Sequence, residues 1–252
     1  MINTRIIPCL LLRDEALVKT VKFQKYSYIG DPVNTCRIFN ELEVDELAFL
    51  DITASRENRG PNYRILQEIA NECFMPLSYG GGITTVEQAG KVLGTGFEKI
   101  VLNTSAFSHP QIICEIADRF GSQSIIVSID VKKSLLGKYD VYSISGTRNQ
   151  KKNPVEWAME AEALGAGEIL LTSIDREGSW KGFDIELIKK VTSSVSVPVI
   201  AHGGAGKPQD IIDAVIQGEA SAAAIGSLVV YQAKDMGVLV NFPDRKYFEG
   251  II

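Results

Sequence analysis

Three aspartates stand at the ends of short β-rich runs, where a carboxylate could meet a bound substrate. Asp51 ends LAFLD, Asp130 ends IIVSID and Asp175 ends ILLTSID. A partly desolvated carboxylate in such a place can act as a general acid or base. It can equally hold a loop by accepting backbone N–H bonds, so both roles stay open for each. His202 ends a similar run, but the other histidine, His109, is distant in sequence, so we expect no metal site and no cofactor.

Two glycine-rich segments, SYGGGITT and AHGGAGK, could form phosphate-binding loops. Each is followed, after the next apolar run, by a short polar segment, LNTS or IGS. Phosphate binds where backbone N–H groups approach closely and point inward, and glycine before a helix N-terminus provides this arrangement. The first predicted cradle comprises Gly81, Gly82, Asn103 and Thr104, and the second comprises Gly203, Gly204, Gly226 and Ser227, with Gly178 nearby. Two cradles predict a ligand with a phosphate at each end; tight turns alone are the alternative.

Four charged residues stand immediately before apolar runs instead of after them. Two are cations and two are anions: Arg5, Glu46, Lys99 and Glu168. Such charges are most often solvated surface groups whose ion pairs contribute little to stability. In a barrel they would instead form a ring at the face opposite the strand ends.

Short β-rich runs alternate with amphipathic stretches along the chain. Eight runs recur: IIPCLLL, LAFLDIT, PLSYGG, IVLNTS, IIVSIDV, ILLTSID, PVIAHGG and AAAIGS. Apolar residues at spacings of three and four predict helices over 31–43, 62–74 and 153–166. Eight alternations favour an α/β fold, a single (β/α)8 TIM barrel over residues 1–252. Polar and glycine-rich segments follow the strands, which places the chemistry at the C-terminal face.

The chain also resembles itself at an offset of between about 119 and 123 residues. Residue 6 then falls on residue 125, which aligns IIPCLLL with IIVSIDV and places Leu11 opposite Asp130. This repeat predicts two half-barrels, about 1–122 and 123–252, with chance likeness between barrel strands as the alternative. Residues 131–152 form the longest interruption. The alternation in KYDVYSI predicts a hairpin there, over the end of the fifth strand.

Composition narrows the class of protein. Hydrophobic residues make up 45% and charged residues 23%, as in a globular protein, and no apolar run approaches the roughly 18 residues of a membrane span. The net charge of -5 provides no broad basic surface for nucleic acid. The first apolar stretch is short and meets charge at once, so we expect no signal peptide. The scattered cysteines form no C-x-x-C pair, so we expect a cytoplasmic protein with reduced thiols at Cys9, Cys36, Cys73 and Cys114.

Together these segments resemble the cyclase subunit of imidazole glycerol phosphate synthase, the barrel that works with a glutaminase in histidine biosynthesis. The resemblance covers nearly the whole chain, through RIIPCL, GDPV, ELAFLDITAS, YGGGI, LNTSA, FGSQSIIVSID, GAGEILLTSIDREG and IAHGGAGK. It implies a TIM barrel, a ligand with two phosphates, and ammonia delivered through the barrel axis. It also implies a heterodimer in which the glutaminase docks on the N-terminal face, with Glu98 assisting.

The resemblance implies a role for the four charges that precede strands. In that family the matching residues form a salt-bridged gate to the ammonia channel, and all four are present: Arg5, Glu46, Lys99 and Glu168. The family's chemistry uses two aspartates as general base and acid, at the ends of the first and fifth strands. Asp130 matches the second aspartate. Leu11 stands where the first should be, and a leucine cannot transfer a proton.

Some other positions match the family's residues, and some differ from them. Cys9, Lys19 and Thr172 match catalytic positions of the family. Glu177 replaces an Asp and His202 replaces a Ser, and the closing segment VLVNFPDRKYFEGII differs from the usual one. The binding and ammonia-handling parts are therefore expected to be kept, while one catalytic part is missing.

Three interpretations of the function stay open. The first is a genuine cyclase that makes imidazole glycerol phosphate and AICAR, with Asp14 or Cys9 covering for Leu11. The second is a paralogue that hands ammonia to a separate sugar amidotransferase in surface-polysaccharide biosynthesis, such as that of lipopolysaccharide. The third is a non-catalytic scaffold that activates a glutaminase. A complete charge ring beside a broken acid pair favours the second, as a lyase or synthase-type subunit of a glutamine amidotransferase complex.

Overall fold

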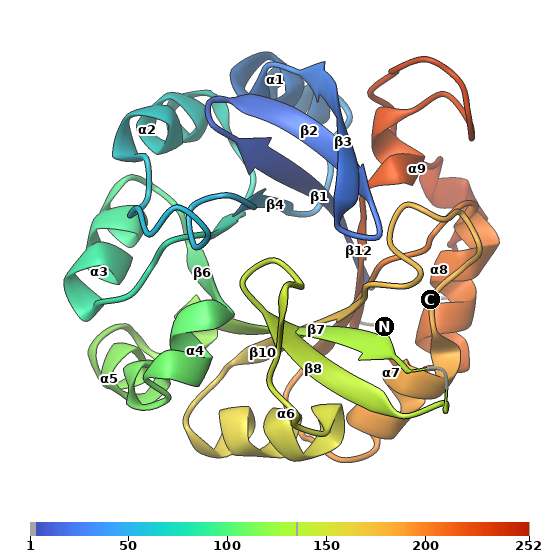
Figure 1. Cartoon of the computed structure of the whole chain (residues 1–252). Helices are drawn as coiled ribbons and strands as arrows, with labels where there is room; N and C mark the ends of the chain where they lie inside the picture. Colours follow the sequence, from blue (N-terminus) through green and yellow to red (C-terminus); the bar gives the residue numbers. More distant parts are fainter. Residues whose placement is uncertain (1–3, 135, 252) are drawn as a thin grey trace.

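Eight parallel strands form a closed barrel in the computed structural model, which describes residues 4–134 and 136–251. The barrel strands are β1 (Arg5–Arg13), β4 (Leu47–Asp51), β5 (Leu77–Gly80), β6 (Lys99–Leu102), β7 (Ile125–Lys133), β10 (Glu168–Ser173), β11 (Val199–His202) and β12 (Ala222–Ile225). Each pairs in parallel with the next, and β12 pairs with β1 to close the ring (Figure 1). The predicted TIM barrel is confirmed.

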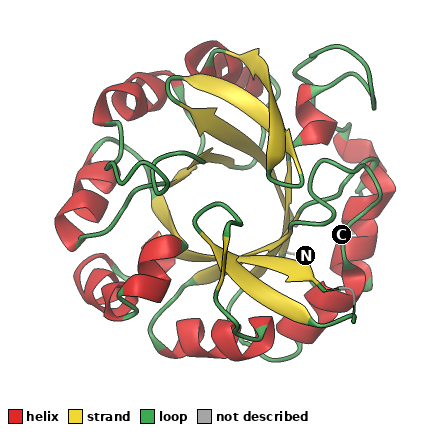
Figure 2. Ribbon diagram, viewed as in Figure 1, coloured by secondary structure: helices red, strands yellow, loops and turns green. Residues whose placement is uncertain are grey.

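Helices cover the outside of the barrel (Figure 2). They are α1 (Pro32–Glu41), α2 (Tyr63–Glu72), α3 (Val86–Gly94), α4 (Thr104–Ser108), α5 (Gln111–Phe120), α6 (Pro154–Ala163), α7 (Ile185–Thr192), α8 (Pro208–Ile216) and α9 (Ser227–Val230), with 3-10 turns η1 (Ser122–Ser124) and η2 (Arg245–Tyr247). The three predicted helices are confirmed as α1, α2 and α6. Asp31, Asn62 and Asn153 start them, because their side-chain oxygens accept backbone amides of the first turn.

The eighth unit departs from the predicted alternation, because no long helix follows β12 as far as residue 251, where the described part of the chain ends. Helix α9 has four residues, and residues 231–251 continue mainly as loops and turns. Gly237 and Pro243 disfavour a helix here, since glycine and proline are the poorest helix formers. Phe242 and Phe248 of this segment pack against the core instead. The unusual closing segment therefore takes the place of the last helix.

Two barrel strands are longer than the others and extend into antiparallel hairpins over the mouth of the barrel (Figure 1). Both β1 and β7 have nine residues. The predicted hairpin is confirmed after β7, where β8 (Tyr139–Ser143) pairs with β7 and with β9 (Arg148–Asn149). The division into two half-barrels stays a prediction.

The hairpin after β1 was not predicted. It is formed by β2 (Ala16–Val21) and β3 (Gln24–Gly30). Tight hairpin turns usually carry glycine or asparagine, because their central residues need positive φ. Here Asp14, Lys22 and Phe23 adopt positive φ without glycine, so the sequence lacked the usual signal.

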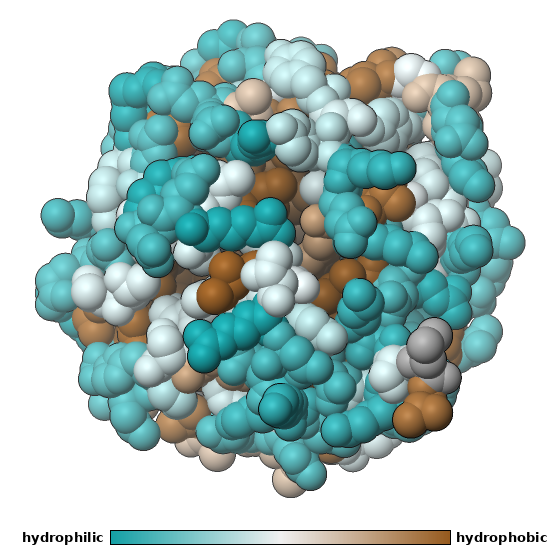
Figure 3. Space-filling view, viewed as in Figure 1, coloured by the Kyte–Doolittle hydropathy of each residue, from teal (hydrophilic) through white to brown (hydrophobic). Residues whose placement is uncertain are grey.

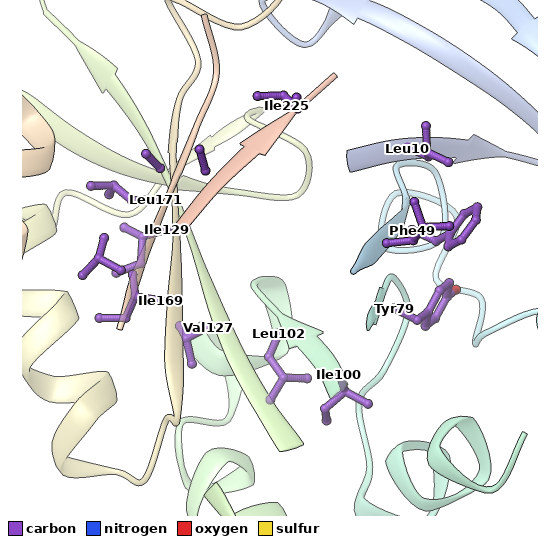
Figure 4. Packing of buried hydrophobic residues seen from close by; sticks show 14 of the residues in the cluster. Leu10, Phe49, Tyr79, Ile100, Leu102, Val127, Ile129, Ile169, Leu171 and Ile225 are labelled. Atoms are coloured by element: carbon purple, nitrogen blue, oxygen red, sulfur yellow. The ribbon is translucent and has the colours of Figure 1, made fainter. Parts of the chain in front are cut away.

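The core has two layers, as strand alternation requires. Inside the barrel, small and medium side chains meet, among them Cys9, Ala48 and Ala224. Outside, larger side chains pack between strands and helices. Figure 4 shows part of this outer layer, with Leu10 on β1, Phe49 on β4 and Tyr79 on β5. The inner layer is thus built partly from small residues at the barrel axis.

Two expectations from composition are met within the described residues. No helix there is long and apolar enough to cross a membrane. The four cysteines are free thiols, with Cys36 buried and Cys73 and Cys114 half-buried. The cytoplasmic location stays a prediction.

Candidate active site at the C-terminal face of the barrel

A cavity of about 900 Å³ opens at the C-terminal face. This volume lies within the range of small-molecule sites, roughly 300–1,000 Å³. Figure 3 shows hydrophobic atoms in a hollow of this face, surrounded by hydrophilic side chains. The cavity brings together twelve of the predicted site residues: Cys9, Leu11, Lys19, Asp51, Gly81, Gly82, Asn103, Thr104, Asp130, Thr172, Glu177 and His202. The glycines and the serine of the second cradle line a much smaller space, which shares Lys19, Glu177 and His202 with the large cavity.

Asp130 lies in β7 among polar side chains and is 8% exposed. Ser128 Oγ donates to its Oδ1 at 3.2 Å, and Asn103 Nδ2 donates to its Oδ2 at 3.3 Å. Burial raises the pKa of Asp130 to about 7, although hydrogen bonds from Ser128 and Thr172 oppose this rise. A carboxyl group with such a pKa can hold or release a proton near neutral pH, as a general acid or base must.

Leu11 lies in β1 and lines the same cavity, 7% exposed. Its neighbours across the sheet are also apolar, Val18 in β2 and Leu50 in β4. Asp14 is exposed in the β1–β2 turn and is not among the residues lining the cavity. Cys9 does line it, but burial raises the pKa of its thiol to about 12. The geometry therefore favours neither residue as a replacement proton carrier.

His202 joins the polar side of the site through Thr172. Thr172 Oγ1 and His202 Nδ1 lie 3.1 Å apart, and Thr172 pairs with Asp130 across β10 and β7. Burial, with the charge of Lys19 nearby, lowers the pKa of His202 to about 3. The imidazole is therefore neutral at physiological pH.

Asp51 and Asp175 hold loops, which was the alternative left open for them. Asp51 Oδ1 accepts the amides of Thr53 and Ala54 at 3.1 and 3.0 Å. Its Oδ2 forms an ion pair with Arg59 Nη1 at 2.7 Å. Asp175 Oδ2 accepts the amide of Lys133 at 2.8 Å. These contacts engage both carboxylates within the protein.

The first cradle opens directly onto the large cavity. Gly81 and Gly82 have φ values of +134° and +70°, which side chains rarely adopt. A Cβ on Gly81 would come within 2.6 Å of Asp51, and one on Gly82 within 2.3 Å of the carbonyl oxygen of Arg59. Glycine is therefore required for this loop to pack against the loop after β4. Asn103 and Thr104 lie beside it in the cavity wall.

The structure brings the residues of the second cradle together around a small space. The side chain of Lys19 lies across it, since a Cβ on Gly226 would come within 3.0 Å of Lys19 Cε. Lys19 Nζ forms a buried ion pair with Glu177, and the two side chains are 7% and 2% exposed. The predicted residues of this cradle are thus adjacent, with an internal ion pair among them.

The four charges at the N-terminal face form a closed ring of alternating sign. Arg5 Nη1 contacts Glu46 Oε2 at 2.7 Å, and Arg5 Nη2 contacts Glu168 Oε2 at 3.1 Å. Lys99 Nζ completes the ring at 3.3 Å from Glu46 Oε2 and 3.0 Å from Glu168 Oε1. Glu46 is nearly buried, so these are not the separate solvated charges of the alternative interpretation.

Sequence reasoning missed several residues of the site, and two of them, Ser128 and Arg59, contact its carboxylates. Ser128 precedes Asp130 by two positions and therefore lies on the same face of β7, a period-two signal that could have identified it. Arg59 follows Asp51 by eight positions in an irregular loop, and no local pattern indicates that it folds back. Within the described ranges no cluster of three or more His, Cys, Asp or Glu side chains is arranged to hold a metal ion.

The fold and the residues at both faces define a (β/α)8 barrel with a polar site at its strand ends. Residues 5–235 match the histidine biosynthesis protein family. The chain is 53% identical over 244 residues to a protein of Pseudomonas aeruginosa provisionally named imidazole glycerol phosphate synthase subunit hisF2, with 97% of each chain covered. A Vibrio vulnificus protein, provisionally named subunit hisF3, is 48% identical over 96% of this chain and 94% of its own.

A third relative carries the family name without a numeral. The imidazole glycerol phosphate synthase subunit HisF of Alkaliphilus metalliredigens is 44% identical over 231 residues, 92% of each chain. The chain belongs to the HisF family of imidazole glycerol phosphate synthase subunits.

Proposed function

We propose that this barrel receives ammonia from a glutaminase docked on its N-terminal face and passes it to an acceptor other than the cyclase substrate. The acceptor we favour is a nucleotide-linked or lipid-linked sugar, aminated by a separate amidotransferase in surface-polysaccharide biosynthesis. The observation that carries the proposal is an intact charge ring at one face combined with Leu11 in place of an acid at the other.

The ring supports a role in handling a small neutral molecule. Its four side chains lie at the start of β1, β6 and β10 and directly before β4, so they surround the barrel axis. Each charge is paired with two charges of opposite sign. A ring of this kind excludes ions from the barrel axis, while a neutral molecule can pass through it wherever a gap opens between the side chains. Ammonia leaving a glutaminase is such a molecule, and the small inner-layer residues Cys9, Ala48 and Ala224 lie along the axis toward the cavity.

The N-terminal face also carries features that suit a protein partner. Phe74, in the loop between α2 and β5, is 89% exposed, and a large exposed aromatic side chain is a typical interface anchor. Glu98 is exposed beside Lys99 of the ring. We propose that a glutaminase buries Phe74 and pairs with Glu98, which would make the functional unit a heterodimer.

A genuine cyclase is the second candidate, favoured by Asp130. Its pKa of about 7 suits acid–base chemistry, and Cys9, Lys19 and Thr172 are present around it. In this interpretation the chain makes imidazole glycerol phosphate and AICAR in histidine biosynthesis. The missing acid at position 11 opposes it, because a positioned acid or base typically contributes about 10²–10⁴-fold to the rate.

Cyclase turnover with saturating ammonia separates the two candidates. The relative from Alkaliphilus metalliredigens, measured alongside, provides the family rate. We expect the wild-type chain to turn over at least about 10²-fold more slowly, the contribution of one acid or base. A rate equal to that of the relative would overturn the proposal in favour of the cyclase. A large gain in Leu11→Asp would assign the low rate to the missing acid.

A further inference from the structure

Three polar residues on neighbouring strands lie side by side in the wall of the large cavity. Thr172 in β10 is paired in register with Asp130 in β7 on one side and with His202 in β11 on the other. Residues paired in register on parallel strands point to the same face of the sheet, and all three line the cavity. All three are also buried. Asp130, Thr172 and His202 therefore form one polar row across the inner wall of the barrel.

The hydroxyl group of Thr172 connects the two ends of the polar row. Thr172 Oγ1 lies 3.1 Å from His202 Nδ1, and a hydrogen bond from Thr172 to Asp130 opposes the rise in the pKa of that carboxyl group. A hydroxyl group has only one proton to donate. When Thr172 donates it to ionised Asp130, Thr172 can only accept from His202, so the imidazole proton lies on Nδ1. When Asp130 is protonated and donates to Thr172, the hydroxyl can donate to Nδ1, so the imidazole proton lies on Nε2.

The second ring nitrogen of His202, Nε2, is left for a ligand. It has no hydrogen-bond partner among the described residues. In the same part of the chain, the fully buried polar side-chain atoms without a partner are Tyr79 Oη, Asp140 Oδ1 and Trp157 Nε1. Nε2 of His202 is not one of them, so it keeps access to the cavity that His202 lines.

The other titratable groups that face the polar row are Cys9 in β1, Lys19 in β2 and Glu177 in the loop after β10. Lys19 and Glu177 form a buried ion pair, so their charges largely offset each other. Burial raises the pKa of the Cys9 thiol to about 12, so this group stays neutral near pH 7. Burial and the charge of Lys19 lower the pKa of His202 to about 3, whereas burial raises that of Asp130 to about 7. Asp130 is therefore the member of the row that changes charge near neutral pH.

We propose that His202 Nε2 is a second proton-transfer site of this cavity, connected to Asp130 through the hydroxyl group of Thr172. With Asp130 ionised, Nε2 carries no proton and can take one from an N–H or O–H group of a molecule in the cavity. The proton on Nδ1 then passes to Thr172 Oγ1, and the hydroxyl group passes its own proton to Asp130. The imidazole and the hydroxyl end neutral, because only the carboxylate changes charge. A weakly basic imidazole can therefore accept the proton.

This relay extends the reach of Asp130 without adding a second acid. One proton is shared along the polar row, so Nε2 can accept it only while Asp130 is ionised. The relay thus does not replace the independent acid that is missing at Leu11. The molecule that it fits is a neutral hydrogen-bond donor. Ammonia is the smallest such donor, and its presence in the cavity rests on the proposed function, whereas the relay itself does not.

Nitrogen-15 NMR of the imidazole tests the relay on the full chain without a ligand. The chain has two histidines, and His109→Gln leaves His202 as the only one. In this background we expect the Nε2–H form to predominate at about pH 5 and the Nδ1–H form at about pH 9, because Asp130 titrates at about 7 between them. Asp130→Asn, added to this background, should abolish the change, since an amide does not titrate.

Thr172→Val tests the connection, because valine has nearly the shape of threonine and lacks the hydroxyl group. In the same background, the proportion of the two imidazole forms should then stay constant from about pH 5 to about pH 9. Thr172→Ser is the matched control, since it keeps a hydroxyl group and should keep the change. Carbon-13 NMR of the Asp130 carboxyl group should show that it still titrates in both variants.

The outcomes separate the relay from the proposed function. A constant proportion of the two forms in the His109→Gln background would overturn the relay. A change that persists in Thr172→Val would also overturn it, because Asp130 would then act on His202 without the hydroxyl group. If Thr172→Val does not fold, the comparison with Asp130→Asn decides. Neither result alters the test by cyclase turnover, and a cyclase rate typical of the family would leave the relay standing.

Discussion

β1 and β7 are the two long strands of the barrel, and they differ at their C-terminal ends, where β1 carries an apolar residue and β7 a carboxylate. Both have nine residues, both are paired in parallel on either side, and both extend into a hairpin. Leu11 and Asp130 occupy matching places in them with nearly equal exposure, 7% and 8%. Burial is therefore not what distinguishes the two positions. The difference lies in what surrounds them.

Each polar neighbour of Asp130 is matched, at the equivalent position near Leu11, by an apolar residue or by glycine. Ser128 and Thr172 correspond to Cys9 and Leu50, by position along the strand and by pairing register. At the end of the neighbouring strand on the other side, Asn103 after β6 corresponds to Gly226 after β12. The loss of the acid in the first half thus comes with a surrounding that offers a carboxylate few hydrogen-bond donors. The comparison teaches that the site is one-sided, because the carboxyl group with a raised pKa and its hydrogen-bond donors lie on the β7 side.

Placing a carboxylate at position 11 gives the largest effect. An aspartate there would be as buried as Asp130 but would lack its donors, so its pKa would be raised further. A carboxyl group with a raised pKa destabilises the fold increasingly as pH rises from its unfolded pKa to its folded pKa, because the folded state disfavours the charged form. We expect Leu11→Asp to be less stable than Leu11→Asn by more than about 4 kcal/mol at pH 8 and by about 1.5 kcal/mol at pH 5.

Leu11→Asn is the matched control, since it has nearly the same shape and does not titrate. Urea unfolding of both variants at the two pH values gives the difference. An equal stability of the two variants at pH 8 would mean that the β1 side can solvate a carboxylate, and the contrast between the strands would be lost.

Removing the carboxylate from the other strand should act in the opposite direction. The pKa of Asp130 is about 7 in the folded chain and 3.8 for an ordinary aspartate, so the folded state binds more protons between these values. Wild-type stability therefore falls as pH rises from about 4 through about 7. Asp130→Asn lacks this loss, so its stability relative to wild type should increase by about 4 kcal/mol on going from pH 4 to pH 8.

The pH series for Asp130→Asn needs only the same unfolding experiment. His202, with its pKa lowered to about 3, destabilises the fold below about pH 6.5, but it is present in both proteins and cancels in the difference. A constant difference between variant and wild type across the range would show that Asp130 titrates at its ordinary pKa.

Much of the barrel follows from sequence, because its strands and helices repeat a strong local pattern. All eight strands were predicted, and so was the grouping of charges such as Arg5 and Glu168, since residues that begin parallel strands share one face. The hairpin of β2 and β3 was not, because its turns use Lys22 and Phe23 at positive φ without glycine.

The state of the second cradle also lay beyond the sequence. Glycines at 203, 204 and 226 indicate close backbone approach, but they do not say what approaches. At Gly226 the neighbour is Lys19, held by Glu177 from a loop 158 residues away in the chain, while Gly203 and Gly204 approach backbone groups of other loops. Long-range side-chain contacts of this kind leave no periodic signal. The pairing of Arg59 with Asp51 was missed for a different reason, because the irregular loop between them has no local pattern.

The smallest expected effect comes from removing one hydrogen bond on the β7 side, the bond from Ser128 to Asp130. Ser128→Cys gives this strand the residue that β1 carries at the matching place, and it replaces the hydroxyl that donates to Asp130 Oδ1. That bond favours the charged form, so its loss should raise the pKa of Asp130 above about 7 and destabilise the chain by about 1 kcal/mol at pH 8. Carbon-13 NMR of the carboxyl group follows the titration directly.

The control is Cys9→Ser, the reciprocal change in β1. The new hydroxyl has no carboxylate at position 11 to which it could donate a hydrogen bond, so the titration midpoint of Asp130 should not change. An unchanged titration midpoint in Ser128→Cys would mean that the Ser128 hydroxyl does not contribute to the pKa of Asp130, and that this pair of positions does not distinguish the two strand ends.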